Sequence, residues 1–402
     1  MKTKKILFIG AYGIENSGDD LPMIVMMQQL QQMYPKESFS FHALTRHPNK
    51  WEEKKFNIVQ HKNLEYQSRQ EAANKWFRGL NFEDDRTIFN EMLSLIESCD
   101  LLIIGAGNFI IDISVDIFKG PIPLIWWYIH LAKLTNTKVM LYGFSTAPLQ
   151  NNYAKLLTKE IMRQSDFISV RDKASKKYLQ TLGVTQKIVS LPDPTLGTTF
   201  TKKYTFLTKK DQIFLLVNSS KPLIALGLRQ FSFPQESKIF DTIIKFINTH
   251  SEYRYIFVPQ STYKEDDDRQ LAQTLATKIN TNISFHIIKK RYTPQELISI
   301  YALCDLTLSI RLHSCVFSHI ANTPAIAINY LPKVAGYMKE MGTTKQLLQI
   351  KDVKPNKLHN IITKTLNKKE KIKKQIHKVV TKKNKKVKKY SQAAFELLEK
   401  KI

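Results

Sequence analysis

Residues 305–329 read DLTLSIRLHSCVFSHIANTPAIAIN and contain two apolar runs separated by a helical pattern. The runs at Asp305–Ile310 and Ala325–Asn329 are typical of buried strands, and His313–Ala321 is typical of an apolar helix. Strands that are apolar almost throughout, joined by a helix, occur in parallel sheets whose two faces are both covered. This stretch therefore predicts one strand–helix–strand unit of an α/β fold.

The same alternation extends in both directions along the chain. Further strands are predicted at Lys5–Gly10, Phe39–Leu44, Asp100–Gly105, Lys138–Gly143, Phe167–Val170, Lys187–Ser190, Leu223–Leu228, Tyr255–Val258 and Ser284–Ile287. Leu196–Lys210 interrupts the rhythm and is interpreted as an interdomain link. We expect two Rossmann-like doubly wound domains, residues 1–200 and 211–350, facing each other across a cleft, and a Lys-rich helical tail at 351–402.

The composition is that of a globular protein, with 43% hydrophobic and 24% charged residues. No signal peptide is recognisable, and the longest apolar stretch, Pro121–Leu134, is too short to span a bilayer. These features predict a cytoplasmic protein. Cys99, Cys304 and Cys315 match no metal motif, so they are interpreted as small core residues, with a reactive thiol as the alternative. No metal site is predicted.

Positive charge is concentrated in the tail. The chain carries a net charge of +26, and residues 351–402 hold 18 lysines against four acids, a net of +14. Such a charge run admits three interpretations: a solvated basic helix, attraction to an anionic membrane surface, and binding of nucleic acid. The tail has no arginine and few aromatic residues to stack on bases, so no nucleic-acid partner is predicted.

The main candidate site follows the strand at Asp305–Ile310. Arg311 and His313 are two residues apart, so on an extended backbone they would point the same way, towards a helix N-terminus. Such a place suits a phosphate or a carboxylate. Lys333 and Arg229 also come after predicted strands and would add cations. In the alternative interpretation Arg311 pairs with an acid such as Asp305, and His313 merely opens a helix.

Loops after strands of the first half carry weaker signals. The segment Gly10–Asp20 is rich in glycine and ends in Asp19 and Asp20, which suit a helix cap. Gly105-Ala-Gly107-Asn108 forms a second compact loop. Arg171 ends a third strand, beside Asp172 as a helix cap. Each admits a purely structural interpretation as a turn, an ion pair or a cap. The acidic run Glu265–Asp268 is interpreted as a helix start on the surface.

Taken in order, these pieces resemble the polysaccharide pyruvyl transferase family over roughly Lys5 to Gly342. The family pattern matches Gly13, Asn16, Gly18 and Asp19, then Ile168–Asp172, Leu182–Val184, Asp193-Pro194, Arg311–His313 and Tyr330–Lys333. The sequence departs from the pattern in the second loop. There the family's run of glycines is reduced to Gly105-Ala-Gly107-Asn108, with Asp112 further on.

The resemblance implies a glycosyltransferase-like (GT-B-like) pair of domains and transfer of pyruvate from phosphoenolpyruvate to a sugar as a cyclic ketal. It implies His313 and Arg311 as catalytic residues. Donor contacts would come from Arg171, Arg229, Arg311 and Lys333, and acceptor contacts from Asn16, Gly18, Asp19 and Asn108.

No cofactor is implied beyond phosphoenolpyruvate as co-substrate. The acceptor would be a sugar or lipid-linked saccharide, with the tail as a membrane contact that would make the protein peripheral at the inner face of the membrane. The alternatives are a glycosyltransferase using a nucleotide sugar and a non-catalytic carbohydrate-binding relative.

Overall fold

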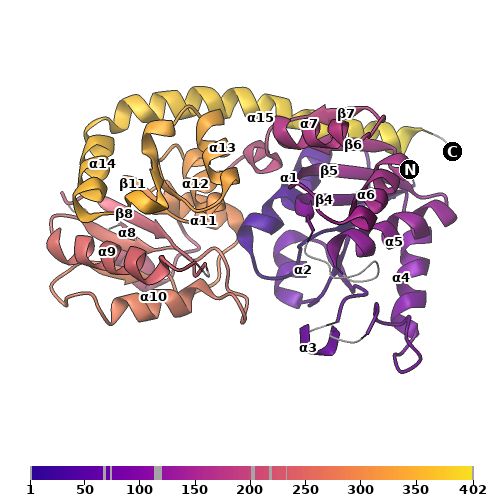
Figure 1. Ribbon diagram of the computed structural model, residues 1–402, viewed down its shortest axis with the longest axis horizontal. Coiled ribbons are helices and arrows are strands. Elements are labelled where there is room, and N and C mark those ends of the chain that lie inside the picture. Colours follow the sequence, from indigo (N-terminus) through magenta and orange to yellow (C-terminus); the bar gives the residue numbers. More distant parts are fainter. Residues whose placement is uncertain are drawn as a thin grey trace. The chain divides into compact units, whose positions relative to one another are not determined.

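The computed structural model describes residues 2–66, 69–72, 75–112, 120–200, 204–216, 220–231 and 233–400. The chain divides into two compact α/β units (Figure 1). The first unit comprises Met1–Ile14, Asp19–Gly197 and Asn384–Ile402, and the second comprises Glu15–Gly18 and Thr198–Lys383. This division differs from the predicted ranges. The short segment Glu15–Gly18 belongs to the second unit, the second unit begins again at Thr198, and the tail is divided between the two units at Asn384.

The first unit is built on a parallel sheet in the order β3-β2-β1-β4-β5-β6-β7. Its strands are β1 (Lys4–Ile9), β2 (Phe39–Thr45), β3 (Val59–Lys62), β4 (Leu101–Ile110), β5 (Lys138–Thr146), β6 (Phe167–Val170) and β7 (Ile188–Ser190). Its helices are α1 (Ser17–Met33), α2 (Lys50–Phe56), α3 (Arg69–Ala72), α4 (Thr87–Glu97), α5 (Pro121–Leu134), α6 (Asn152–Gln164) and α7 (Lys173–Thr181), followed by the 3₁₀ turn η1 (Pro194–Gly197).

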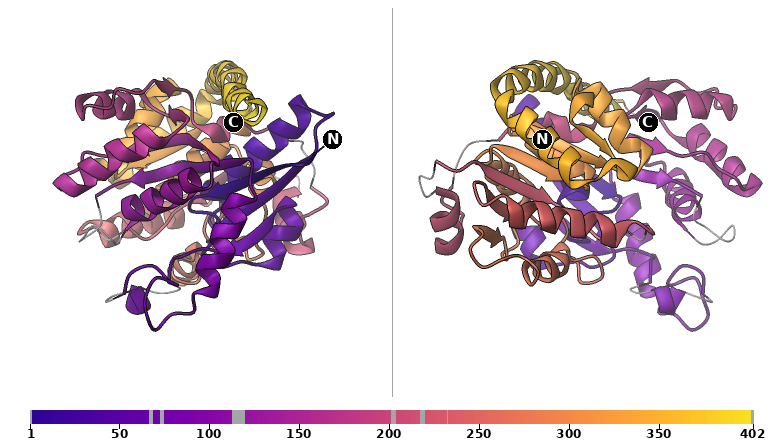
Figure 2. Two further views of the ribbon diagram at one scale, coloured as in Figure 1. Left: turned by 90° about the vertical axis from the view of Figure 1, so that its right-hand side faces the viewer. Right: turned by 60° about the vertical axis from the view of Figure 1, so that its left-hand side comes forward.

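Helices cover both faces of this sheet, as the near-continuous apolar strands predict (Figures 1 and 2). Neighbouring residues of β5 show the alternation, because successive side chains point to opposite faces. Leu141 is fully buried in the core cluster that also contains residues of α4, α5 and α6. Tyr142 is equally buried, but its hydroxyl donates to the Pro22 carbonyl of α1 at 3.0 Å.

The second unit repeats the plan with a parallel sheet in the order β10-β9-β8-β11-β12-β13. Its strands are β8 (Leu223–Gly227), β9 (Arg254–Phe257), β10 (Phe285–Ile287), β11 (Leu306–Ser309), β12 (Ala325–Asn329) and β13 (Leu347–Gln349). Its helices are α8 (Lys209–Leu216), α9 (Glu236–Thr249), α10 (Asp268–Ala276), α11 (Pro294–Tyr301), α12 (Leu312–Ile320), α13 (Pro332–Glu340) and α14 (Pro355–Asn367), with 3₁₀ turns η2 (Thr344–Gln346) and η3 (Ile350–Asp352).

The strand–helix–strand unit predicted from residues 305–329 is confirmed as β11, α12 and β12. Strands β11 and β12 are parallel neighbours, with Thr307 paired to Ala325. The predicted link Leu196–Lys210 contains the end of η1 and the start of α8. Residues 201–203 within it lie outside the described residues.

The predicted helical tail is present as α14 and α15 (Lys369–Glu399). Near its end, Tyr390 donates to the Pro192 carbonyl at 3.0 Å, and Phe395 stacks on Tyr34 with ring centroids 3.6 Å apart. Because these contacts fall within the first unit, the last turns of α15 group with that unit.

None of the described helices combines the length and the apolar character needed to cross a membrane. The three cysteines are buried and unbridged. Burial raises the pKa of Cys99 to about 11 and that of Cys315 to about 12. Their thiols therefore stay protonated near neutral pH, which confirms the interpretation as small core residues.

Candidate functional site

The second sheet has a topological switch point between β8 and β11. These strands are neighbours, but the chain leaves them in opposite directions, towards β9 and towards β12. In doubly wound folds ligands bind beyond the carboxyl ends of the strands at such a point. Arg229 follows β8 and Arg311 follows β11, so the strand order places both arginines at this edge.

Arg311 is held in a buried ion cluster, with only 6% of its side chain exposed. Its Nη2 donates to Asp268 Oδ1 at 2.6 Å and to Asp266 Oδ2 at 3.0 Å. The other oxygen of Asp268 accepts the backbone N–H groups of Gln260 and Ser261, at 2.9 and 3.0 Å. Burial raises the pKa of the Asp268 carboxyl, and the Arg311 guanidinium opposes that shift.

Arg229 joins the same cluster from a more exposed position. Its Nη2 donates to Asp266 Oδ1 at 3.2 Å, and 32% of its side chain is exposed. One carboxylate, Asp266, therefore bridges the two arginines, with one oxygen to each. The alternative that paired Arg311 with an acid was right about the pairing but wrong about Asp305. Asp305 instead accepts from the Leu223 backbone and from Lys369.

His313 lies in the first turn of α12, because this helix begins at Leu312. Arg311 itself has an extended backbone, but Leu312 is already helical. The expectation of an extended backbone from Arg311 to His313 is therefore wrong. An ideal Cβ built on Gly18 would lie 2.0 Å from His313 Nδ1 and 2.7 Å from His313 Cβ. Residue 18 thus has to be glycine for the histidine ring to keep its place.

The segment Glu15–Gly18 is fixed to the loop after β9 by its backbone. Asn16 forms an antiparallel bridge with Ser261, and the Ser17 N–H donates to the Gln260 carbonyl at 2.9 Å. Asn16 Oδ1 accepts the Gly18 N–H at 3.1 Å, which caps the first turn of α1. These bonds explain why this short segment groups with the second unit.

Of the four predicted acceptor residues, Gly18 therefore lies beside His313, and Asn16 and Gly18 both belong to the unit expected to bind the donor. Asp19 lies in the first turn of α1 and belongs to the first unit. Asp20, the other predicted cap, accepts the Gly13 N–H at 3.3 Å. Lys333 is exposed in the first turn of α13, which follows β12.

A second polar cluster lies at the carboxyl ends of β4, β5 and β6 in the first unit. Arg171 is its centre, with 10% of its side chain exposed. It donates through Nε to Ser145 at 2.7 Å, through Nη1 to Asp193 at 2.9 Å and through Nη2 to Asn108 at 3.3 Å. The structure thus joins Arg171 and Asn108, which the sequence had assigned to donor and acceptor separately. Asp172 caps α7 as predicted, accepting the Ser175 N–H at 2.7 Å.

Sequence reasoning missed Asp266 and Asp268, the acids that hold Arg311. The run Glu265–Asp268 does start a helix, and Asp267 caps α10 by accepting the Arg269 N–H. Asp268, however, is buried rather than on the surface. The sequence offered one usable signal, since this run comes directly after the residues that follow β9, at the same sheet edge as Arg229 and Arg311.

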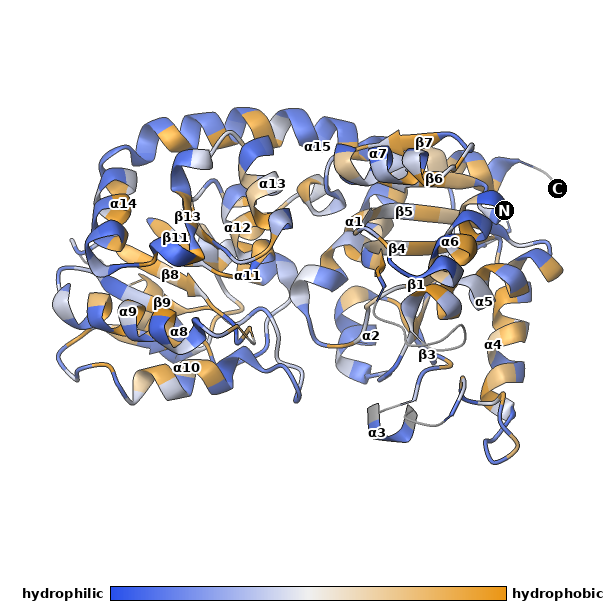
Figure 3. Cartoon of the chain, viewed as in Figure 1, coloured by the Kyte–Doolittle hydropathy of each residue, from blue (hydrophilic) through white to orange (hydrophobic). Residues whose placement is uncertain are grey.

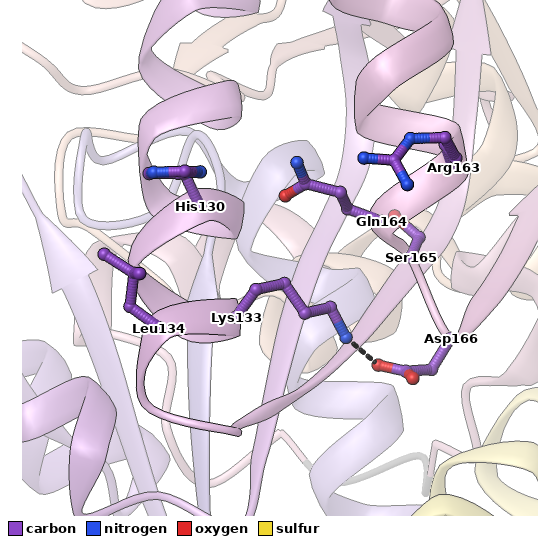
Figure 4. Close-up of a pocket in the computed structure, with 7 residues that line it drawn as sticks. All are labelled: His130, Lys133, Leu134, Arg163, Gln164, Ser165 and Asp166. Atoms are coloured by element: carbon purple, nitrogen blue, oxygen red, sulfur yellow. Dashed lines mark hydrogen bonds and ion pairs between the residues drawn. The ribbon is translucent and has the colours of Figure 1, made fainter.

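Figure 4 shows a hollow at the opposite edge of the first sheet, lined by residues from the ends of α5 and α6 and the start of β6. Lys133 forms an ion pair with Asp166 at 2.6 Å across it. Arg163 pairs with Glu160 nearby. The charges around this hollow are neutralised in pairs, and the hollow lies away from the carboxyl ends of the strands. Among the described residues no group of His, Cys, Asp and Glu side chains is arranged to hold a metal ion.

His319 in α12 links the site helix to pH-dependent stability. It is 1% exposed, its Nδ1 lies 3.0 Å from the Tyr337 hydroxyl, and burial lowers its pKa to about 3. A histidine in the unfolded chain titrates near pH 6.5. Below that pH the unfolded chain binds a proton at His319, whereas the folded chain keeps this side chain neutral.

We expect this group alone to lower the free energy of unfolding by about 1.4 kcal/mol per pH unit between about pH 6 and pH 4. Urea unfolding over this range should show a shallower pH slope in His319→Gln than in the unsubstituted protein. Replacement of the exposed His377 by Gln should leave the slope unchanged. Equal slopes in all three proteins would contradict the assignment.

With this geometry established, the comparisons with known proteins decide the family. The family model described as polysaccharide pyruvyl transferase matches residues 16–332. The chain belongs to the polysaccharide pyruvyl transferase family. The matched range includes both arginine clusters, His313 and the buried Asp268, whereas α14 and α15 lie outside it.

A curated relative of this pyruvyl transferase family member is the amylovoran biosynthesis protein AmsJ of Erwinia amylovora. The two are 24% identical over 298 residues, covering 70% of this chain and 69% of AmsJ. Solved structures also resemble the whole chain, and two of them illustrate the fold.

A glycosyltransferase from Rickettsia africae has a TM-score of 0.62 at 13% identity and covers 100% of both chains. UDP-GlcNAc 2-epimerase from Neisseria meningitidis, bound to UDP-GlcNAc, has a TM-score of 0.59 at 11% identity, covering 98% of this chain and 99% of that one. These likenesses show the fold, which is GT-B-like as expected.

Proposed function

We propose that this pyruvyl transferase family member moves the pyruvyl group of phosphoenolpyruvate onto two hydroxyls of one sugar, forming a cyclic ketal on a cell-surface polysaccharide or its lipid-linked precursor. The observation that carries the proposal is the cluster at the switch point of the second sheet. Two arginines share one carboxylate there, and a histidine lies in the first turn of the helix after β11. A small donor with a phosphate and a carboxylate needs cations and a proton source together.

The reaction requires one proton to enter and two to leave. Protonation of the methylene carbon of phosphoenolpyruvate makes C2 electrophilic. The first sugar hydroxyl attacks C2 and loses its proton, and the C2–O bond to phosphate breaks. The second hydroxyl closes the ring and loses its proton in turn. One released proton replaces the one added to the methylene carbon, and the other leaves with the phosphate.

Arg229 is the donor contact that the structure supports best. It is partly exposed, and so is its partner Asp266, with 32% and 38% of their side chains accessible. A phosphate or carboxylate arriving at this edge can replace Asp266 at the Arg229 guanidinium. Arg311 keeps its buried partner Asp268, so its part is to place a second fixed positive charge beneath the anion. Lys333 and Arg171 remain proposed donor contacts.

His313 is proposed to deliver the proton to the methylene carbon. Imidazole titrates near neutral pH, so a histidine can both give and recover a proton during turnover. Asn16 and Gly18, which pack on the same unit, then shape the surroundings of His313 instead of receiving the acceptor. Asp19 and Asn108, in the first unit, remain the proposed acceptor contacts.

The test is calorimetric titration with phosphoenolpyruvate, followed by turnover with a saccharide acceptor. We expect Arg229→Ala to lower donor affinity at least about tenfold, since a charged hydrogen bond is lost. Arg46→Ala is the matched control, because Arg46 forms an equally exposed ion pair with Glu65, 31% and 35% accessible. His313→Gln should bind the donor but lose turnover, measured as phosphate release.

Two outcomes would overturn the proposal. Full turnover in His313→Gln with only a weaker apparent donor affinity would remove the proton-transfer role. Tight binding of uridine diphosphate, with none of phosphoenolpyruvate in the presence of acceptor, would favour a glycosyltransferase that uses a nucleotide sugar.

A further inference from the structure

Helix α15 carries an uninterrupted row of exposed lysines along one side. Lys371, Lys374, Lys378, Lys382, Lys385 and Lys389 follow one another at spacings of three or four residues, and all six are exposed. Residues at such spacings lie on one face of a helix. We call these six residues the lysine row. At a rise of 1.5 Å per residue it extends for about 27 Å.

The opposite side of α15 is committed to the body of the protein. Ile376, Val387 and Tyr390 are fully buried, and Ile372 nearly so. The ion pairs described for α15 within this stretch use other lysines, such as Lys369 with Asp305 and Lys383 with Glu340. Burial of this side therefore fixes which way the lysine row faces.

The lysine row carries charge of a single sign. Between Glu370 and Glu396 the helix has no acidic residue and no arginine. Its Phe and Tyr side chains there, Tyr390 and Phe395, contact the body of the protein, where Tyr390 is fully buried and Phe395 stacks on Tyr34. Figure 3 shows α15 as mainly hydrophilic, with short hydrophobic segments along it. Like charges along one helix repel one another, so this arrangement costs stability unless an anionic partner offsets it.

We propose that the lysine row binds the surface of an anionic lipid bilayer. A row of exposed lysines along one side of a helix presents its charges to a flat anionic surface. The row offers no arginine fork and no exposed ring, the groups that bind nucleic acids and stack on bases. Because the apolar side of α15 is buried in the protein, binding is electrostatic, without insertion of the helix.

This inference concerns where the protein works and does not depend on the donor chemistry. The tail cannot be tested by deletion, since removing α15 would expose Tyr142 and Tyr34, which Tyr390 and Phe395 cover. The sharper variant replaces Lys374, Lys378, Lys382 and Lys385 by Gln. All four are exposed, so the fold should be unaffected. The matched control replaces four exposed lysines elsewhere by Gln: Lys36, Lys54, Lys177 and Lys238.

Binding is measured by co-sedimentation of the full chain with vesicles of phosphatidylcholine alone, or of phosphatidylcholine mixed with phosphatidylglycerol. We expect binding only to the anionic vesicles, weakened by salt, and reduced by about a hundredfold or more in the lysine-row variant. The control variant should bind nearly as the unsubstituted chain does.

An equal loss of vesicle binding in both variants would show that binding depends only on net charge, and it would overturn the proposal. So would the absence of binding to anionic vesicles, or preferential binding to DNA or to an anionic polysaccharide in competition with vesicles. Turnover on a water-soluble acceptor should be the same in the lysine-row variant as in the unsubstituted protein. That readout separates failure of this inference from failure of the proposed reaction.

Discussion

Replacement of Gly18 by Ala should lower turnover about a hundredfold or more while the protein still folds. The added Cβ would lie 2.0 Å from His313 Nδ1, 2.4 Å from Cγ and 2.7 Å from Cβ. No rotation of the ring alone relieves contacts with all three atoms, so the histidine or the segment 15–18 must move. A displacement of about 1 Å at a reacting group is enough for a loss of this size.

The matched control is Gly336→Ala in α13, where an added Cβ meets nothing within 4 Å. That substitution should leave turnover unchanged and stabilise the helix by about 0.5–1 kcal/mol. In the His313→Gln background, Gly18→Ala should cost little further, because the two substitutions act on one group. Turnover within about twofold of normal in Gly18→Ala would contradict the role given to this contact.

Replacement of Arg311 by Met should destabilise the protein by about 3–5 kcal/mol at neutral pH, because it leaves Asp268 buried without its cation. The pKa of Asp268 is already raised by burial and would rise further without Arg311. A carboxyl whose folded pKa is above its unfolded pKa is harmless while protonated and costs stability as the pH rises through the folded pKa. The loss should therefore grow from about pH 4 upwards.

Urea unfolding across this pH range checks both the size and the sign of the effect. The control is Arg229→Met, whose exposed pair with Asp266 should contribute no more than about 1 kcal/mol. The double variant Arg311→Met/Asp268→Leu should regain part of the stability, since it removes the unpaired charge. A stability loss in Arg311→Met that does not change with pH would argue against an unpaired Asp268 as its cause.

The arginine cluster could be predicted only in part, because its members are far apart along the chain. The sequence identified Arg311 as a candidate because it follows a strand, and the structure confirms that position. The sequence assigned the acidic run Glu265–Asp268 to the surface, because a run of acids at a helix start is usually solvated. Only the packing of β9 beside β8 and of β11 on its other side brings Asp268 to Arg311, 43 residues further along the chain.

The placement of Asn16 and Gly18 in the second unit could not be predicted, for a related reason. Local sequence places them in the loop after β1, and therefore with the first sheet. Their backbone bonds to Gln260 and Ser261 tie them to the second unit. A four-residue segment has no hydrophobic periodicity of its own, so nothing local reports which core it joins.

The sequence by itself determined the two parallel sheets, most of their strands and the helical tail, but it did not indicate the short edge strands β3 and β13. These features depend on the period of apolar residues within short windows and on the requirement that a parallel sheet be covered on both faces. The tertiary structure alone decided which charges meet: Asp266 between two arginines, Gly18 against His313, and Arg171 with Asn108. Those contacts join residues far apart in the chain, and the free energy that selects them comes from burial and pairing of charge, which no local pattern records.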